Sequence, residues 1–432
     1  MISSGSTTHF RRRDYVKITI FGLAVSALWG SLHSVILPLR LLDFVAESQK
    51  NTYLGLLTLT GLLLAMAYQP IAGAISDRSG FRWGRRRPFI LVGGVLAMVF
   101  IPGIGLVESY AAIFAVYCLL QLSTNTAQGP YQAFIPDLAP EERRGLASGV
   151  KTLLEVVGGI GLVYIITFLG NRFLGDGAWI SLVLALLVAL MLGGMLVTII
   201  TVKERPGIPG PRQPFFPTLL KSYRIDLHRS PGFITFLVSR LLFIMALTTL
   251  QSFALYFFRD TVAVANPTRA TVELLAIVGV GMVGSVYPAG RLSDRVGRRP
   301  VLLSSGIIGA AGILFLLLGP GYGYILVGGG LQGIAVGTFM SSNWALATDL
   351  VPRTEAARYL GLTNLATAGG AALARLVGIG IDFFNGYSPG LGYKFMLLVC
   401  LAYFIAGSAL VFKIKGRAQP NQGTARSPSE AR

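Results

Sequence analysis

The chain has 432 residues, of which 53% are hydrophobic and only 13% are charged, and its mean hydropathy is +0.65. Soluble domains carry about 25% charged residues, so this composition excludes an ordinary soluble protein. The formal charge of +18 does not indicate a nucleic-acid partner, because the basic residues lie in short segments between long apolar runs. That arrangement is typical of a protein that crosses a membrane many times.

Twelve apolar runs that are long enough to cross a bilayer follow one another along the chain. Lipid offers backbone groups no hydrogen-bonding partner, so each run is predicted to be a helix. The predicted fold class is therefore an all-α membrane protein with twelve transmembrane helices. The predicted spans are 17–41, 53–76, 88–107, 109–133, 146–169, 179–202, 232–258, 271–292, 300–319, 322–348, 359–384 and 393–414.

Lysine and arginine are distributed unevenly over the segments that connect these spans. The N-terminus, the even-numbered connections and the C-terminal tail hold 29 of the 37, which predicts that both termini are cytoplasmic. The proline-rich segment 203–231 is predicted to be a cytoplasmic linker. It divides the chain into one six-helix bundle over 1–202 and another over 232–415, and the polar tail 416–432 is predicted to be disordered.

Two short basic connections share one sequence pattern. The first reads G-A-I-S-D-R-S-G from Gly73, and the second reads G-R-L-S-D-R-V-G from Gly290, which is 217 residues later. The arginines alone could serve only to set topology. An aspartate at the same place in both copies suggests an ion-paired latch, and the glycines permit tight turns. We interpret both connections as gating hairpins, with the candidate residues Gly73, Asp77, Arg78, Gly80, Arg85, Arg86, Arg87, Gly290, Asp294, Arg295 and Gly297.

The duplicated hairpin resembles the loop motif of the major facilitator superfamily, and segments 134–140 and 346–352 repeat as well, at an offset of 212. The ending F-R-W-G-R-R-R-P-F-I of the first hairpin is more specific. It resembles the sugar–cation symporters of the melibiose permease type (the glycoside–pentoside–hexuronide:cation symporters). It is still more similar to the sucrose–proton symporters of plants and their relatives. Q-G-P at 128–130 agrees with the second resemblance.

This resemblance implies two six-span repeats that work by alternating access, with a latch that holds the cytoplasmic side closed in one state. The chain also departs from these families. Gln132 stands where sucrose transporters commonly have arginine, and Asn125 stands where proton-coupled members often have it. The membrane acids with which the melibiose type couples cations are absent from spans 1, 2 and 4.

Polar residues concentrate in spans 1, 4, 7 and 10, which are therefore predicted to line a central cavity. Glutamine and asparagine both donate and accept hydrogen bonds, as sugar hydroxyls require, and aromatic rings can stack on a sugar. The alternative for each residue is a hydrogen bond between helices or ordinary core packing. The candidate substrate-binding residues are Trp29, His33, Gln121, Asn125, Gln128, Gln251, Asn343 and Trp344.

Charged residues inside a span are costly, so they should face protein or water. Glu155 lies about ten residues into span 5, and Lys151 lies one turn earlier on the same face and can pair with it. Arg240 lies in span 7 and Arg375 in span 11. One hypothesis makes Glu155 the carrier of a proton or another cation, with its pKa biased by Lys151 or Arg240. The alternative is a fixed ion pair that locks two helices together.

The function predicted from these features is secondary active transport, specifically proton-coupled symport of a sugar or glycoside. Two alternatives stay open: an exporter or carrier of another amphiphilic small solute, and a non-transporting sensor or assembly factor with a transporter fold. The sequence has no P-loop and no metal-spaced His/Cys cluster, so no enzyme activity, cofactor or metal is expected. The expected partners are a small-molecule substrate, a proton or other cation and membrane lipids, but no nucleic acid. The protein is expected to be a monomer in the cell membrane.

Overall fold

The computed structural model describes residues 10–165, 178–204, 231–319, 321–350 and 356–414. All regular secondary structure within these ranges is helical, which confirms the all-α prediction. Most of the predicted linker (205–230) and the C-terminal tail lie outside the described residues. The helices of the N-terminal half are α1 (Arg12–Lys17), α2 (Ile20–Ser31), η1 (Leu32–Ile36), α3 (Leu37–Leu41), η2 (Glu47–Gln49), α4 (Lys50–Asp77), α5 (Arg87–Leu106), α6 (Tyr110–Gln132), α7 (Phe134–Leu138), η3 (Glu141–Arg143), α8 (Arg144–Val156), η4 (Val157–Leu162) and α10 (Ala178–Thr201).

The second half begins after the linker and is built in the same way. Its helices are α12 (Pro231–Phe257), η6 (Phe258–Val262), α13 (Pro267–Val296), α14 (Arg298–Leu318), α15 (Tyr322–Leu350), α16 (Ala356–Leu373), η8 (Ala374–Leu376), α17 (Val377–Asn385) and α18 (Leu391–Lys413). Several of these helices are longer than the predicted apolar spans, because polar residues at their ends are helical as well.

Eleven helical segments in the described ranges are long and apolar enough to cross a membrane. Helix α6, which covers the predicted fourth span, is not among them. Its second half carries Gln121, Thr124, Asn125 and Gln128, which lower its hydropathy. The twelfth crossing therefore stays a prediction, and three of the polar residues that set α6 apart, Gln121, Asn125 and Gln128, are residues predicted to bind substrate.

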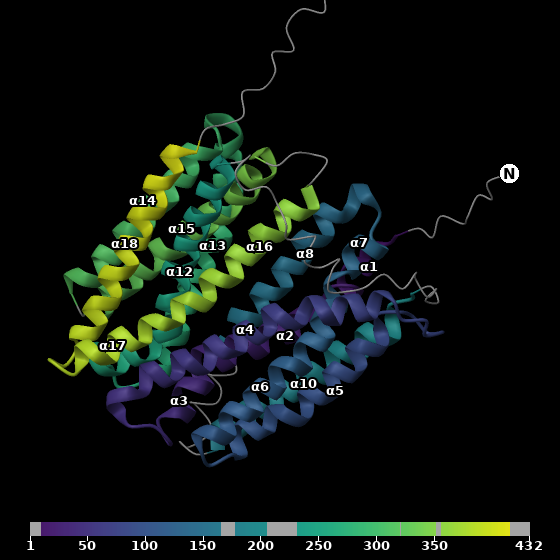
Figure 1. Ribbon diagram of the computed structural model, residues 1–432, viewed down its shortest axis with the longest axis horizontal. Coiled ribbons are helices and arrows are strands. Elements are labelled where there is room, and N and C mark those ends of the chain that lie inside the picture. Colours follow the sequence, from purple (N-terminus) through teal and green to yellow (C-terminus); the bar gives the residue numbers. More distant parts are fainter. Residues whose placement is uncertain (1–9, 166–177, 205–230, 320, 351–355, 415–432) are drawn as a thin grey trace, which may run out of the picture.

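Equivalent helices pack together in the two halves. Helices α4 and α5 pack on α6 as α13 and α14 pack on α15, and α2 packs on α10 as α12 packs on α18. Figure 1 shows the result as two bundles, with the purple-to-blue helices of the N-terminal half on one side and the green-to-yellow helices on the other. The internal duplication seen in the hairpins thus extends to the packing of the helices.

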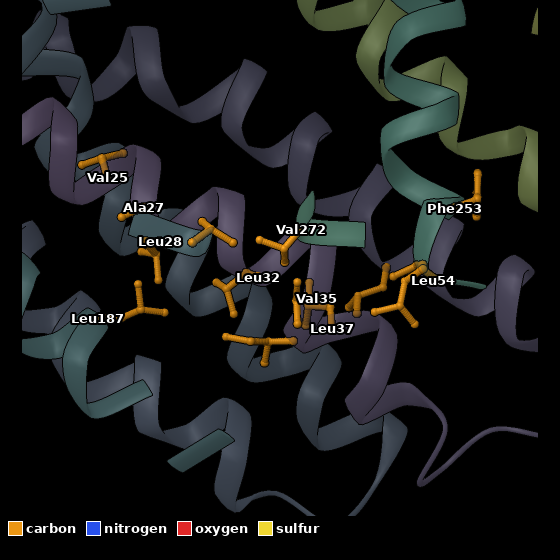
Figure 2. Close-up of a cluster of buried hydrophobic side chains, with 14 of the residues drawn as sticks. Val25, Ala27, Leu28, Leu32, Val35, Leu37, Leu54, Leu187, Phe253 and Val272 are labelled. Atoms are coloured by element: carbon orange, nitrogen blue, oxygen red, sulfur yellow. The ribbon is translucent and has the colours of Figure 1, made fainter. Parts of the chain in front are cut away.

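Each long helical segment of the chain forms a rod. The two halves meet along the first and second rods, Arg12–Leu41 and Glu47–Asp77. Helix α4 contacts α16, η8 and α17 of the C-terminal half, and the first rod contacts α12 and α13. Figure 2 shows part of this core, in which Val35 and Leu54 lie near Phe253 of α12 and Val272 of α13. Burying these side chains away from water and lipid holds the halves against each other.

In the described ranges, four of the rods, numbered along the chain with α6 as the fourth, contain an internal turn that is not α-helical. The first, fifth and seventh contain the π-helical turns η1, η4 and η6, and the eleventh contains the 3-10 turn η8. Rods one and seven, and rods five and eleven, are equivalent positions in the two halves. Such turns inside helices often mark functional sites, and η1 carries His33 while η8 carries Arg375.

The connections between the helices lie at two ends of the molecule. The hairpin end carries residues 78–86 and Gly297, which connect α4 to α5 and α13 to α14. The opposite end carries residues 42–49 and 386–390.

Candidate functional site

A cavity of about 890 Å³ lies between the two halves. Its walls come from the first rod, α4, α6 and α8 of the N-terminal half and from α16 of the C-terminal half. It runs from the middle of α4 and α6 to residues of both helices that lie near the hairpin end. The lining residues are Trp29, His33, Leu62, Ala65, Met66, Gln69, Pro70, Gly73, Gln121, Asn125, Gln128, Gly129, Gln132, Lys151, Asn364, Leu365 and Ala368.

A chain of polar and aromatic side chains forms one wall of the cavity. The ring of Trp29 stacks on His33 at 5.2 Å between centroids, and His33 Nε2 shares a 2.9 Å hydrogen bond with the hydroxyl of Tyr117. Gln121 donates to the same hydroxyl at 3.0 Å, and Asn125 donates to the backbone carbonyl of Gln121 at 2.8 Å. This wall therefore offers donors and acceptors beside a flat aromatic face, which suits a polyhydroxylated ligand.

Tyr117 was not predicted as a site residue, although it links two residues that were. It is fully buried, and it lies four residues before Gln121 and eight before Asn125, so all three share one face of α6. This spacing was visible in the sequence. The cavity-lining residues Gln69, Gln132 and Asn364 were not predicted either.

Five of the eight predicted substrate-binding residues line the cavity: Trp29, His33, Gln121, Asn125 and Gln128. The other three lie elsewhere in the C-terminal half. Gln251 is exposed on α12. Asn343 is buried and accepts a hydrogen bond from Arg240, whose guanidinium also lies 5.1 Å from the ring centroid of Trp344.

Lys151 and Glu155 lie one helical turn apart on α8, with Lys151 Nζ 3.6 Å from a carboxylate oxygen of Glu155. Lys151 lines the cavity. The Glu155 side chain is 34% exposed and packs against the backbone of α2, where a Cβ on Gly22 would lie 3.2 Å from its Oε1. The carboxylate thus has one cationic partner and partial access to its surroundings.

Two interior arginines belong to the C-terminal half and lie apart from this pair. Arg240 donates a 2.8 Å hydrogen bond to Thr367 Oγ1 in addition to its contact with Asn343. Arg375 is buried and donates to Ser252 Oγ. No carboxylate among the described residues forms an ion pair with either arginine. In the same ranges, no three His, Cys, Asp or Glu side chains gather closely enough to hold a metal ion.

The first hairpin is tied to three neighbouring helices by acidic side chains. Arg86, only 4% exposed, pairs with Asp77 at the end of α4 and with Asp137 of α7, whose Oδ2 lies 3.0 Å from Arg86 Nη2. Asp137 also lies 2.8 Å from Arg85 Nη2, and this hydrogen bond raises the pKa of the Arg85 guanidinium. The ion pairs of the first hairpin thus lie inside the N-terminal half, and its role as a latch stays a prediction.

Glu204, just after α10, holds the beginning of α5. Its carboxylate accepts hydrogen bonds from the backbone N–H groups of Arg86, at 3.1 Å, and Arg87, at 3.0 Å. A carboxylate at the positive end of a helix is stabilising. Burial nevertheless raises the pKa of the Glu204 carboxyl, and the two backbone hydrogen bonds only partly oppose this effect. The sequence did not predict Glu204 as part of the hairpin.

The glycines and remaining arginines of the first hairpin have different surroundings. Gly73 lies in α4 where α4 crosses α6 closely at Gly129. Arg78 directly follows α4, Gly80 lies in the turn, and Arg87 donates to the carbonyls of Trp83 and Ile199. Gly84, which was not a predicted site residue, has a φ of +124°, a conformation that other residues rarely adopt.

The second hairpin is shorter and more exposed. Gly290, Asp294 and Arg295 lie in the last turns of α13, and Gly297, with a φ of +97°, connects α13 to α14. Asp294 lies 2.6 Å from Arg298 Nη1, but its side chain is 73% exposed.

At the opposite end, polar contacts join the two halves. Asp382 of α17 accepts from the side chain of Asn51 at 2.8 Å and from the backbone N–H of Thr52 at 2.6 Å. Lys50 Nζ lies 2.6 Å from Asp260 Oδ2. Further pairs are Arg259 with Glu47, at 2.6 Å, and Tyr256 with the carbonyl of Pro38, at 2.7 Å. These bonds bridge the halves beyond the end of the cavity.

Taken together, the helical rods, the repeated packing and the central cavity define a multi-pass membrane transporter fold. Residues 22–417 match the family model described as "MFS/sugar transport protein", and the chain belongs to this family.

Curated relatives match over a shorter segment. The sucrose transport protein SUC3 of Arabidopsis thaliana is 29% identical over 132 residues, which is 26% of this chain and 22% of that protein. The sucrose transport protein SUT1 of Oryza sativa subsp. japonica is 33% identical over 124 residues, 24% of this chain and 23% of that protein. The chain thus spans less than a quarter of the length of these relatives.

Solved structures agree in fold along nearly the whole chain. A bacterial homologue of the human lysosomal transporter Spinster, in an inward-facing and unoccupied conformation, has a TM-score of 0.73 at 17% identity and covers 95% of this chain and 98% of its own. The D-xylose-proton symporter has a TM-score of 0.68 at 17% identity, with 93% and 97% covered. At this identity the likeness shows the fold alone.

Proposed function

We propose that the protein is a secondary active transporter that moves a sugar or glycoside by proton-coupled symport through alternating access. The observation that carries the proposal is the cavity between the halves, with its wall of Trp29, His33, Gln121 and Asn125. Amide, hydroxyl and imidazole groups can exchange hydrogen bonds with sugar hydroxyls, and the indole of Trp29 can cover a sugar face. Family membership and the sucrose-transporting relatives support the same substrate class.

In this proposal both termini and the hairpin end are cytoplasmic, in the cell membrane, as the excess of lysine and arginine at that end favours. The cavity then runs toward the cytoplasm while the bonds around Asp382 and Lys50 keep the outer end shut. Transport requires those bonds to break and the hairpin end to close. The hairpins gate that end, and the six-helix bundles over 1–202 and 232–415, which the linker 203–231 joins, rock about the substrate.

The coupling ion is assigned to Glu155, with Lys151 as its partner. Their separation of 3.6 Å is longer than a tight ion pair, and Lys151 reaches the cavity while Glu155 lies one turn along α8. A sugar hydroxyl that accepts a hydrogen bond from Lys151 would draw the ammonium group away from Glu155, which links solute binding to protonation. Arg240 influences this pair only at a distance, since its hydrogen bonds go to Asn343 and Thr367.

The proposal is tested by uptake into proteoliposomes containing the purified full-length protein. A panel of monosaccharides and disaccharides is offered with and without an imposed pH gradient. We expect at least one sugar to accumulate against its gradient only when the interior is the alkaline side. Transport of other amphiphilic solutes but of no sugar would contradict the substrate class, and binding without any transport would favour a sensor.

Glu155→Gln should abolish accumulation driven by the pH gradient while leaving exchange of solute across the membrane. The neutral amide keeps the shape of the side chain but cannot take up and release a proton. Glu142→Gln is the matched control, because Glu142 is an exposed acid in the same part of the chain, in η3. Unchanged gradient-driven uptake by Glu155→Gln would contradict the assignment of the coupling residue.

A further inference from the structure

The first hairpin carries an insertion, F-R-W-G at 81–84, that has no counterpart in the second hairpin and no part in the proposed transport cycle. Its first three side chains all project outward. Phe81 is 49% exposed, Trp83 is 40% exposed and Arg82 between them is exposed as well. Two large aromatic side chains beside a cation are an unusual surface for a loop that has only water around it.

The turn that presents these three residues is held in place from several sides. Gly84 supplies the positive φ that ends the turn, and Glu204 binds the backbone N–H groups of Arg86 and Arg87. Arg87 donates to the carbonyl of Trp83 at 3.0 Å, with its guanidinium carbon 5.5 Å from the centroid of that ring. The projection of Phe81, Arg82 and Trp83 is therefore a fixed feature of the fold.

These aromatic residues continue the apolar outer face of α5. Phe81 packs edge-on against Phe89 in the first turn of α5, at 6.3 Å between centroids. Beyond Phe89, the same face of the helix exposes Val92, Leu96 and Val99. Exposed valine and leucine along a membrane-crossing helix face lipid, so Phe81 lies at the end of this lipid-facing surface, where it meets the polar headgroups, and Trp83 is two residues further along the same turn.

The charge of the hairpin is not balanced. Five arginines lie at 78–87, and the acids that contact the hairpin are Asp77, Asp137 and Glu204. Arg82 makes no ion pair or hydrogen bond with any other residue that the structure describes. Its free guanidinium can form paired hydrogen bonds to a phosphate group.

We propose that Phe81, Arg82 and Trp83 form a binding site for an anionic phospholipid at the hairpin end. The two rings insert at the level of the headgroups, and Arg82 binds the lipid phosphate between them. The proposal commits to a lipid rather than to a soluble phosphate compound, because the aromatic residues continue the lipid-facing side of α5. The second hairpin, which lacks both rings, should bind no such lipid.

The depth of the loop can be measured by the fluorescence of Trp83. The chain has four tryptophans, so the full-length variant with Trp29→Phe, Trp179→Phe and Trp344→Phe reports this position alone. In nanodiscs, we expect strong quenching by lipids that carry a spin label near the headgroup and weak quenching by aqueous iodide. The reverse pattern would overturn the proposal, since it would place Trp83 in water.

Lipid selectivity is measured on full-length protein with all four tryptophans, by native mass spectrometry with phosphatidylglycerol and phosphatidylcholine. A basic residue at an anionic membrane surface contributes about 1 kcal/mol, so Arg82→Gln should bind phosphatidylglycerol roughly fivefold more weakly. Phe81→Ser should also weaken the binding of phosphatidylglycerol. The matched control is Arg295→Gln, since Arg295 is an exposed arginine of the second hairpin. Equal retention of phosphatidylglycerol by Arg82→Gln and Arg295→Gln would overturn the proposal.

Discussion

The two basic hairpins share a sequence pattern but differ in how deeply their ion-paired side chains are buried. In the first, Arg86 is buried and bound by Asp77 and Asp137, while Glu204 holds the start of α5. In the second, Asp294 is mostly exposed and its ion pair with Arg298 stays within four residues. A repeated motif therefore does not imply equal burial of its charged side chains.

This difference follows from what surrounds each copy. The partners of the first hairpin come from the ends of α7 and α10, so four helices of the N-terminal half are joined at one point. In the second hairpin the ion pair between Asp294 and Arg298 is more exposed than the pairs of Arg86, so we expect it to contribute less to stability. The variants below test that comparison.

Arg86→Ala should cause the largest loss of folding stability. It removes a buried cation and leaves Asp77 and Asp137 without it, which should lower the free energy of unfolding by about 3 kcal/mol, since both acids are partly exposed. The measurement is unfolding by titration with a denaturing detergent. Arg295→Ala, at an exposed arginine of the second hairpin, is the control and should change stability by less than about 0.5 kcal/mol. Equal losses from both variants would show that the hairpins are equally anchored.

Gly84→Ala should cost about 2 kcal/mol, because alanine resists a φ of +124°. Its Cβ would also lie 2.9 Å from the Cβ of Glu204 and displace the carboxylate that holds α5. Gly297→Ala is the matched test in the second hairpin, where φ is +97° but the nearest atom to a new Cβ, Pro300 Cδ, is 3.8 Å away. We expect the thermal unfolding temperature to fall further for Gly84→Ala, and the opposite order would contradict the role of Glu204.

The sequence predicted the helical architecture closely, because apolar runs leave little freedom. The span predicted at 88–107 is helix α5, Arg87–Leu106, and the span predicted at 393–414 is α18, Leu391–Lys413. The predicted substrate-binding residues of spans 1 and 4 converge on one cavity, since both rods border the gap between the halves. Gln251 does not line this cavity, because on a helix that is apolar all round the sequence does not reveal which face turns inward.

The contacts of the first hairpin could not be predicted in this way. Glu204 lies 118 residues from Arg86 in the chain, and nothing in its local sequence indicates that α10 ends beside the start of α5. In the sequence, Asp137 stands out only as a member of the repeated segment 134–140. Its pairing with Arg85 and Arg86 depends on how α7 turns back toward the hairpin. Long-range pairs of this kind follow from tertiary packing, which no local pattern encodes.

Glu204→Ala should cost about 1 kcal/mol, because it leaves the backbone N–H groups of Arg86 and Arg87 without their acceptor. Glu204→Gln separates shape from charge. Burial raises the pKa of Glu204 above its ordinary value of 4.5, so the protonated form is favoured in the folded protein. The stability that this protonated form contributes to the fold is complete below about pH 4.5 and is lost as the pH rises through the pKa of Glu204 in the folded protein. The stability of Glu204→Gln relative to wild type should therefore increase with pH over this interval, and a decrease would mean that the carboxylate is favoured.

Asp294→Asn should have the smallest effect, below about 0.5 kcal/mol, because its ion pair with Arg298 is exposed and spans one helical turn. Added salt should reduce even this difference, since exposed pairs are screened. The matched variant in the first hairpin is Asp77→Asn, which loses a partner of the buried Arg86 and should cost more at every salt concentration. Unfolding of both variants at low and high salt decides the comparison. If Asp294→Asn were the more damaging of the two, the second hairpin would have to be anchored by contacts beyond its ion pair, and the asymmetry between the halves would be reversed.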